Sequence, residues 1–256
     1  MLRLWPESLR VGLFPGHCWL QGRRAAIGNS LWCASPAGSV DLLRAFETLL
    51  DGRTNELVKG SRIALTVSDS LAAIILLPWQ ESLRSPAERE NYARILFDKQ
   101  GINVTDNWVM RTAVRSFRAT GIAYAFSREW LTELAEIVKA RKLRLGFVLP
   151  ITAAAYFGRQ GNRRGARTLV LLQEENRTSA LIFSRGKLLS RDVEPVTSSD
   201  HQSGERLLRR IVASYDDIAR VVNWSTNPPE QTKIPEFISQ CLPNAETRLL
   251  RRGAWN

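Results

Sequence analysis

The sequence predicts an α/β protein built from two similar lobes. Segments with strand and helix patterns follow the order strand, strand, strand, helix, strand, helix, strand, helix, and this order occurs twice in the 256 residues. The first copy also contains an additional β/α block. Strands interleaved with helices favour a helix-covered sheet in each lobe. A repeat of this length is too long for a solenoid, whose units span about 20–50 residues.

The first copy opens with three short apolar segments separated by turn residues. Phe14-Pro15-Gly16-His17 forms a turn signal between the first two, and polar residues precede the third. Apolar side chains at helical spacing follow and end at Gly52. The expected elements are strands at 9–13, 18–20 and from 25 toward 32, a helix at 42–50, and a strand at 62–67.

The additional β/α block, at about residues 68–126, interrupts the first copy. Pro78 ends its first strand, and Ser85, Pro86 and Glu88 form the capping box of a helix. The expected elements of the block are a strand at 72–77, a helix at 86–100, and strands at 108–114 and 121–126. The first copy then continues with a helix capped by Ser127, a strand at 143–149, and a short helix at 150–157.

A Gly/Arg-rich linker at 158–167 separates the two copies, after which the opening pattern returns. The expected elements of the second copy are strands at 168–172, 179–183 and 188–193, a helix at 207–215, a strand at 218–222, a helix at 234–241, and a strand at 245–250. We therefore divide the chain into a first lobe at 1–157, an insertion subdomain at about 68–126, the linker, and a second lobe at 168–256.

Neither the apolar segments nor the cysteines indicate export or a membrane span. The longest apolar run, 71–79, has nine residues, whereas a spanning helix needs about 20. The N-terminus lacks the pattern of a signal peptide, so we expect a cytoplasmic protein. Cys18, Cys33 and Cys241 form no Cys-x-x-Cys pair, and therefore predict neither a zinc site nor a disulfide framework.

The net charge of +11 is concentrated between residues 138 and 167, a stretch without any acidic residue. Its eight cations are Lys139, Arg141, Lys142, Arg144, Arg159, Arg163, Arg164 and Arg167. Such a field favours an anionic neighbour: an acidic protein, lipid headgroups or nucleic acid. A solvated basic face that only maintains solubility explains the charge equally well. The stretch also lacks the interleaved aromatic residues of a nucleic-acid stacking platform, which disfavours nucleic acid.

Several short phrases resemble the actin-like (ribonuclease H-like) scaffold proteins of bacterial type IV pilus and type II secretion machines. They are Leu77-Pro78-Trp79, the capped helix with Arg94 and Leu96, Gly101, Ala125-Phe126-Ser127-Arg128 with Leu131 and Leu134, Arg141-Lys142-Leu143-Arg144-Leu145, and residues 169–193. The resemblance implies two actin-like lobes with an insertion in the first. It also implies a non-catalytic adaptor at the inner face of the bacterial inner membrane, with the cytoplasmic tail of an inner-membrane protein as its partner. Peripheral contact with the membrane is a further expectation.

Nucleotide-hydrolysing members of that superfamily place an Asp and a Gly-rich turn after the first strand of each lobe, for metal and phosphates. Here the first turn has Phe14, Pro15 and Gly16, and Pro15 has no N–H to donate. The second turn has no glycine; it consists of Gln173, Glu174, Glu175 and Asn176. Glu174 or Glu175 could ligate Mg²⁺, but we interpret this segment as a solvated turn. We therefore expect degenerate phosphate turns and no cofactor; an ATP-binding enzyme with atypical turns remains the alternative.

No other constellation predicts catalysis or a metal site. His17 and His201 have no neighbouring nucleophile motif. The pair Asp192 and Glu194 would share one face of a strand, but without a histidine or third carboxylate we interpret it as surface charge.

The resemblance also implies a groove beside the insertion that holds a short peptide of the partner. The residues that we expect to bind this peptide are Trp79, Arg89, Tyr92, Arg94 and Ile95. For Trp79, packing within the lobe is the competing interpretation, and the favoured one, because most tryptophans are largely buried.

Overall fold

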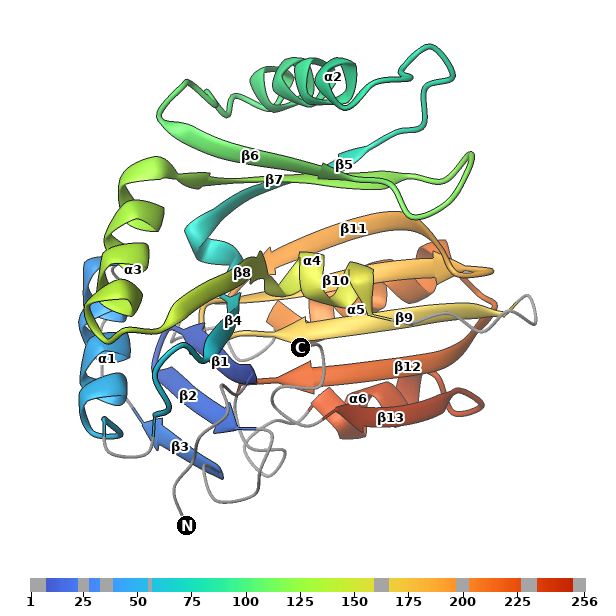
Figure 1. Ribbon diagram of the computed structural model, residues 1–256. Helices are drawn as coiled ribbons and strands as arrows, with labels where there is room; N and C mark the ends of the chain where they lie inside the picture. The colour runs from blue at the N-terminus through green and yellow to red at the C-terminus, as the bar shows by residue number, and fades with distance from the viewer. Residues whose placement is uncertain are drawn as a thin grey trace.

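The computed structural model consists of two sheet-and-helix lobes with a small third unit above them (Figure 1). The structure describes residues 8–22, 28–32, 39–54, 57–158, 166–196, 203–226 and 234–250. Within these ranges no helix is both long and apolar enough to cross a bilayer.

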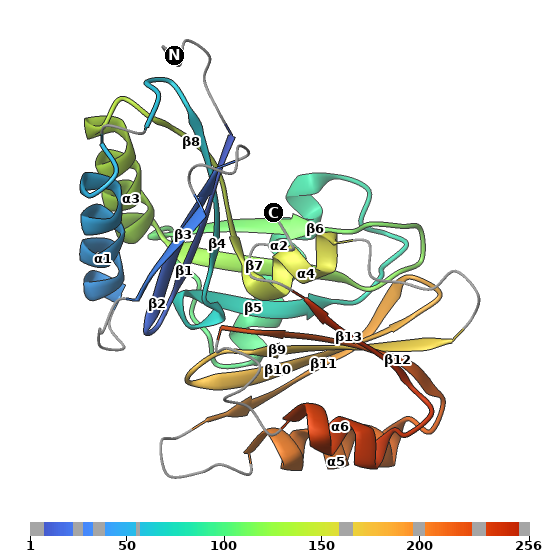
Figure 2. The same cartoon turned by 90° about the horizontal axis from the view of Figure 1, so that it is seen from below.

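The first lobe contains a five-stranded mixed sheet with the strand order β3-β2-β1-β4-β8. Its strands are β1 (Ser8–Phe14), β2 (His17–Gly22), β3 (Gly28–Trp32), β4 (Arg62–Val67) and β8 (Arg144–Pro150). Helices α1 (Ser39–Asp51) and α3 (Arg128–Ala140) cover one face of this sheet, as Figure 2 shows. Buried Leu9, Val11 and Leu13 alternate along β1 and belong to the same core cluster as the apolar residues of both helices.

The second lobe repeats this arrangement with the strand order β11-β10-β9-β12-β13. Its elements are β9 (Arg167–Gln173), β10 (Arg177–Ser184), β11 (Lys187–Pro195), α5 (Ser203–Ser214), β12 (Ile218–Ser225), α6 (Ile234–Cys241) and β13 (Glu246–Leu250). The order of the two sheets is the same when β9 is matched with β1 and β13 with β8. The predicted duplication is therefore confirmed.

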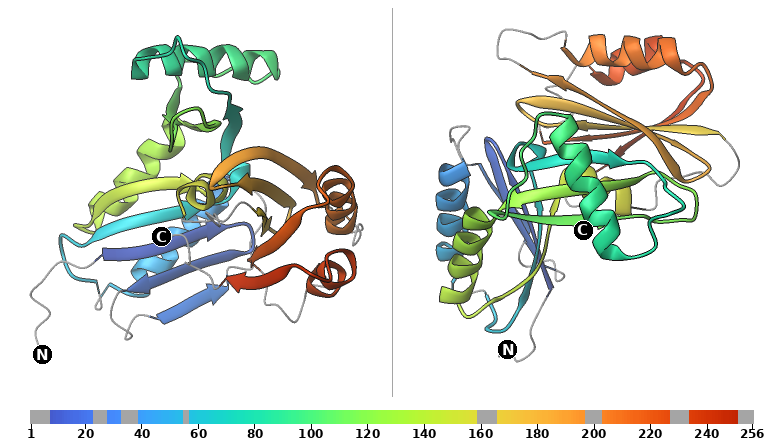
Figure 3. Two further views of the ribbon diagram at one scale, coloured as in Figure 1. Left: turned by 90° about the vertical axis from the view of Figure 1, so that its right-hand side faces the viewer. Right: turned by 90° about the horizontal axis from the view of Figure 1, so that it is seen from above.

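The insertion leaves the first lobe after β4 and returns at α3. It consists of the short 3₁₀ helix η2 (Asp69–Leu71), β5 (Ala72–Leu77), α2 (Pro86–Lys99), β6 (Trp108–Ala113) and β7 (Gly121–Ser127). The three strands form an antiparallel sheet in the order β5-β7-β6. Helix α2 lies on the face that points away from the lobes (Figure 3), over a core that includes Ile75, Phe97 and Met110. The opposite face, with Ile74 and Tyr124, joins the main core.

One cluster of buried apolar side chains runs through both lobes and the insertion. It includes Leu13 and Phe14 of β1, Leu172 of β9, and Trp224 of β12. The rings of Phe14 and Trp224 lie 5.1 Å apart between centroids. The short helix α4 (Ile151–Phe157) is buried in the middle and contacts β4, β7, β8 and β9.

Several sequence-based boundaries and contacts need correction. The predicted start of the third strand, at 25–27, lies outside the described residues, and the strand is described from Gly28; the short helix η2 has no counterpart in the prediction. On α2 the fully buried residues are Ala93 and Phe97, whereas Ile95 is 53% exposed. Most of the predicted linker lies outside the described residues.

Candidate functional site

The turns that follow the first strand of each lobe meet at the lobe interface. Gly16 of the β1–β2 turn has φ +71°, a conformation that glycine adopts without strain. A Cβ atom at Gly16 would collide with the carboxylate of Glu175 from the β9–β10 turn. Phe14 packs against Trp224. The exposed carboxylate of Glu175 therefore lies directly beside the backbone of Gly16.

Glu174 is buried at this interface, with only 4% of its surface exposed, so its interpretation as part of a solvated turn is wrong. Its Oε1 atom accepts a hydrogen bond from the backbone N–H of Asp69, at 3.3 Å. Its Oε2 atom is buried and has no hydrogen-bond partner among the described residues. Burial, followed by the negative charge of Asp69, raises the pKa of Glu174 to about 8. Glu174 is therefore mainly protonated at neutral pH.

Asp69 occupies the centre of the interface and binds groups from three other elements. Its carboxylate accepts hydrogen bonds from the N–H and the Oγ1–H of Thr152, at 3.0 and 2.6 Å. The hydroxyl of Ser179 donates at 3.4 Å, and a guanidinium nitrogen of Arg191 lies 3.5 Å away. Thr152 is the second residue of α4, whereas Ser179 and Arg191 belong to β10 and β11. Asp69 therefore links the root of the insertion to the second lobe.

The sequence analysis did not identify Asp69. A signal was present, because the polar segment Ser68-Asp69-Ser70 directly follows a buried strand. Both carboxylate oxygens of Asp69 already accept hydrogen bonds from protein donors. They are therefore not free to bind a metal ion or a reacting group. Within the described ranges, no group of three or more His, Cys, Asp or Glu residues could hold a metal ion. The geometry of the cluster is that of a structural link between lobes.

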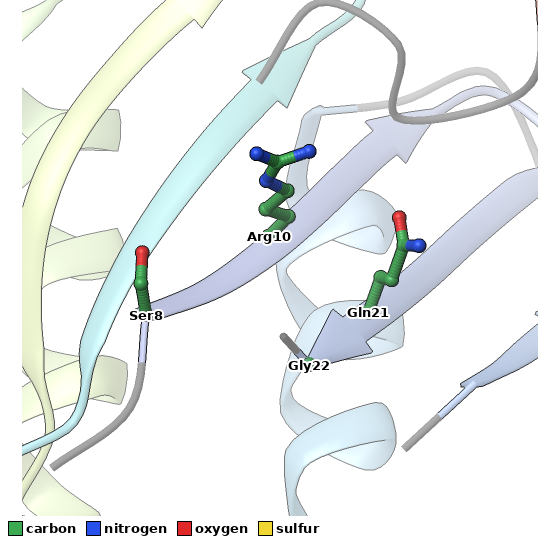
Figure 4. Close-up of a pocket in the computed structure, with 4 residues that line it drawn as sticks. All are labelled: Ser8, Arg10, Gln21 and Gly22. Carbon is green, nitrogen blue, oxygen red and sulfur yellow. The ribbon is translucent and has the colours of Figure 1, made fainter. Parts of the chain in front are cut away.

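A separate polar pocket of about 360 Å³ opens on the first-lobe sheet, lined by Ser8, Arg10, Gln21 and Gly22 (Figure 4). Arg10 and Gln21 are partners in the β1–β2 register, so their side chains lie on the same face of the sheet. This pocket is at the opposite end of β1 from Phe14, and it is therefore distinct from the two turns.

No protein-family model and no curated protein matches the sequence. Three solved structures share its architecture over almost its whole length. An actin-like ATPase-fold protein of unknown function from Bacteroides thetaiotaomicron has 12% identity and a TM-score of 0.62, and the match covers 98% of this chain and 94% of that one. The PilM-PilN type IV pilus biogenesis complex matches with 12% identity and a TM-score of 0.64, covering 96% and 88%.

The cytoplasmic domain of EpsL, an inner-membrane component of the type II secretion system of Vibrio cholerae, has 14% identity, a TM-score of 0.51, and coverage of 98% and 88%. The chain has the actin-like fold. The fold class that the sequence predicted is therefore confirmed.

In this actin-like protein, the residues expected to bind a peptide lie on the insertion but differ in environment. Trp79 is half-buried, with its ring edge-on to Phe117 at 5.1 Å. Tyr92 is also half-buried, and its hydroxyl oxygen accepts a hydrogen bond from the amide of Gln80, which follows Trp79. The segment after β5 therefore lies against α2.

The other three expected peptide-binding residues also lie on α2. Arg89 is half-buried, and Arg94 donates to the backbone oxygen of Val104, at 3.1 Å. Ile95 points to solvent. Neither Trp79 nor Tyr92 is a fully buried core residue, so both retain surface that a partner could contact.

In the part of the 138–167 stretch that the structure describes, some of the expected anion-facing cations are paired within the protein and others are exposed. Arg141 forms ion pairs with Glu47 and Asp51 of α1, and Arg167 pairs with Asp217 of the second lobe. Both cations pair with carboxylates of the protein itself, and not with an external anion as predicted. Lys139, Lys142 and Arg144 are exposed. Arg159, Arg163 and Arg164 lie outside the described residues.

The remaining catalytic candidates are in charge-paired or buried positions. Asp192 and Glu194 both bind Arg210, at 3.2 and 2.7 Å, and these ion pairs attach β11 to α5. His17 is buried within β2, whereas His201 lies outside the described residues. The described surroundings of these side chains contain no arrangement of nucleophile, base and orienting group.

Proposed function

We propose that this actin-like protein is a non-catalytic scaffold that binds the cytoplasmic segment of an inner-membrane protein in a pilus- or secretion-type machine. Two structures of the same fold support the proposal: PilM is present with PilN in a pilus biogenesis complex, and EpsL is an inner-membrane secretion component. A position at the inner face of the membrane is part of the same proposal.

The proposal that the protein is non-catalytic rests mainly on the contact between Gly16 and Glu175. A phosphate-binding turn needs backbone N–H groups that a phosphate can approach closely. Here the carboxylate of Glu175 occupies that approach at Gly16, and a negative group there repels a nucleotide. Pro15 offers no N–H, and the buried Glu174 contacts the backbone of Asp69.

The site that we propose for the partner lies on the insertion, at the segment after β5 and the exposed side of α2. Both β5 and β6 pair only with β7 among the described strands, so each outer strand has an edge to which an extended peptide could add. Tyr92 and Trp79 supply partly exposed aromatic surface, and Ile95 supplies exposed apolar surface. Aromatic residues of this kind dominate the binding energy of many interfaces.

Site-specific photocrosslinking in the native cell tests this assignment. A photoreactive aromatic residue replaces Ile95, and in a matched control it replaces Leu249 of β13, which is similarly exposed (53% and 50%) but lies on the second lobe. We expect position 95, and not position 249, to crosslink to the cytoplasmic segment of an inner-membrane protein. Equal crosslinking at both positions, or none at 95, rejects the proposed site. ATP hydrolysis by the purified protein rejects the non-catalytic assignment.

A further inference from the structure

Two loops from different lobes meet at one margin of the molecule. The loop between β6 and β7 belongs to the insertion, and the turn between β10 and β11 belongs to the second lobe. Thr120 of the first loop and Leu188, at the start of β11, form an isolated antiparallel bridge. The amine of Lys187 donates to the backbone oxygen of Phe117, at 3.4 Å. Figure 1 shows both loops at the right-hand margin, beyond the ends of the sheets.

Phe117 is the most exposed of the large apolar residues described, with 67% of its surface accessible. Its ring stands edge-on against the half-buried Trp79, and the guanidinium carbon of Arg118 lies 5.2 Å from its centroid. The two aromatic rings and the cation therefore form one surface feature. The packing of the subdomain does not require Phe117, because its side chain is outside the core clusters.

The surroundings of Phe117 carry only positive charge in both loops. Arg118, Arg185 and Lys187 are exposed, and neither residues 107–119 nor residues 181–191 include an acidic residue. On the Trp79 side, the nearest acid in sequence is Glu81. We call Trp79, Phe117, Arg118, Arg185 and Lys187 the tip patch.

Two of these cations have an unfavourable backbone conformation. Arg118 has φ +54° and Arg185 has φ +50°; the only other described non-glycine residue with positive φ is Lys142, at +57°. Glycine or asparagine adopts this left-handed conformation more easily than arginine. Each of the two adjacent loops therefore has an arginine where the backbone favours glycine or asparagine. This indicates that the positive charge, and not the turn conformation, is the reason for arginine at these positions.

We propose that the tip patch binds the surface of an anionic lipid bilayer, independently of any protein partner. Aromatic side chains favour the headgroup level of a membrane, and neighbouring Lys and Arg are attracted to anionic lipids. The patch projects from the margin, and its most exposed group is an apolar ring on a loop. This geometry suits insertion between headgroups. An acidic peptide would instead need a groove or a free strand edge at Phe117.

Vesicle co-sedimentation of the purified protein tests the proposal without a protein partner. The vesicles contain either phosphatidylcholine alone or phosphatidylcholine with about 30% phosphatidylglycerol. We expect binding only to the anionic vesicles, weakened by high salt because exposed charges are screened. Phe117→Ala should weaken binding at least ten-fold, and Arg118→Asn and Arg185→Asn about five-fold each, the effect of one cation near such a surface.

Lys59→Asn is the matched control, since Lys59 is an exposed cation outside both the tip patch and the basic stretch at 138–167. It should change vesicle binding less than two-fold, and none of the variants should lower the thermal midpoint. Equal loss in the control, equal binding to neutral vesicles, or no vesicle binding by the unmodified protein would overturn the proposal. So would binding to soluble polyglutamate with the same dependence on Phe117 and without binding to vesicles.

Discussion

The backbone N–H of Asp69 lies 3.3 Å from Oε1 of Glu174, which places acidic residues of the insertion and the second lobe in one buried site. The Asp69 carboxylate is compensated by Thr152, Ser179 and Arg191, whereas Glu174 has no comparable donors to its Oε2 atom. The two carboxyl groups therefore have different roles. Asp69 links the lobes through these hydrogen bonds and the contact with Arg191, whereas Glu174 is accommodated mainly as a neutral acid.

Glu174→Gln should make the protein more stable at alkaline pH. The pKa of Glu174 is about 8 in the folded protein, against an ordinary value of 4.5. Between these values the unfolded chain has released the proton that the folded protein keeps. The free energy of unfolding therefore falls as pH rises from 4.5 to 8, and this contribution does not change further above 8. At pH 8 we expect the variant to be about 2–4 kcal/mol more stable, since one pKa unit corresponds to about 1.4 kcal/mol.

Urea denaturation at pH 5 and pH 8 measures this effect, and the difference between variant and unmodified protein should shrink at pH 5. Glu175→Gln is the control for a charge change in the same turn. A gain in stability that is equal at both pH values would contradict the protonation of Glu174.

Asp69→Ala should destabilise the protein by about 3–5 kcal/mol. The substitution leaves Arg191 as a largely buried cation without its carboxylate and removes the acceptor for Thr152. Denaturant unfolding measures the loss. The exposed Asp216→Ala should change stability by less than about 0.5 kcal/mol. A loss below about 1 kcal/mol for Asp69→Ala would mean that this link contributes little.

Millimolar Mg-ATP should not raise the thermal midpoint of the protein. A ligand that binds only the native state adds about 2.7 kcal/mol at 100 times its dissociation constant. We expect no such gain, because the Glu175 carboxylate lies beside Gly16 and Pro15 has no N–H to donate. Differential scanning calorimetry, with an ATP-binding actin-like protein as the positive control, measures the shift. Stabilisation of that size would favour the alternative of an ATP-binding enzyme.

Tyr92→Ala should weaken binding of the protein partner by about 2 kcal/mol or more while the fold stays intact. Tyr92 is half-buried, and its removal costs only the bond with Gln80 and contacts at the edge of the insertion core. Trp79→Ala should behave in the same way. A binding titration beside circular dichroism separates the two effects, and Arg84→Ala, an exposed residue of the same segment, is the control. Loss of fold in both aromatic variants would contradict a role in binding.

Local sequence signals were sufficient for most of the fold. The strand Ala72–Leu77 has the predicted bounds because Pro78 ends it, and α2 begins after Ser85 because a capping box forms there. The interface was not predictable in the same way. Asp69 and Thr152 are 83 residues apart in sequence, and Glu174 appeared solvated because its own neighbours are polar. Burial by another lobe leaves no local periodicity to detect.

The apolar cluster that includes Phe14, α4 and Trp224 has a mechanical consequence. A hinge opening between the lobes would transfer these side chains into water, at about 25 cal/mol for each Å² exposed. The protein therefore resists opening at the interface between its two lobes. A partner bound at α2 would stay at a constant distance from a partner bound at α5. A force applied to one partner would therefore be transmitted to the other.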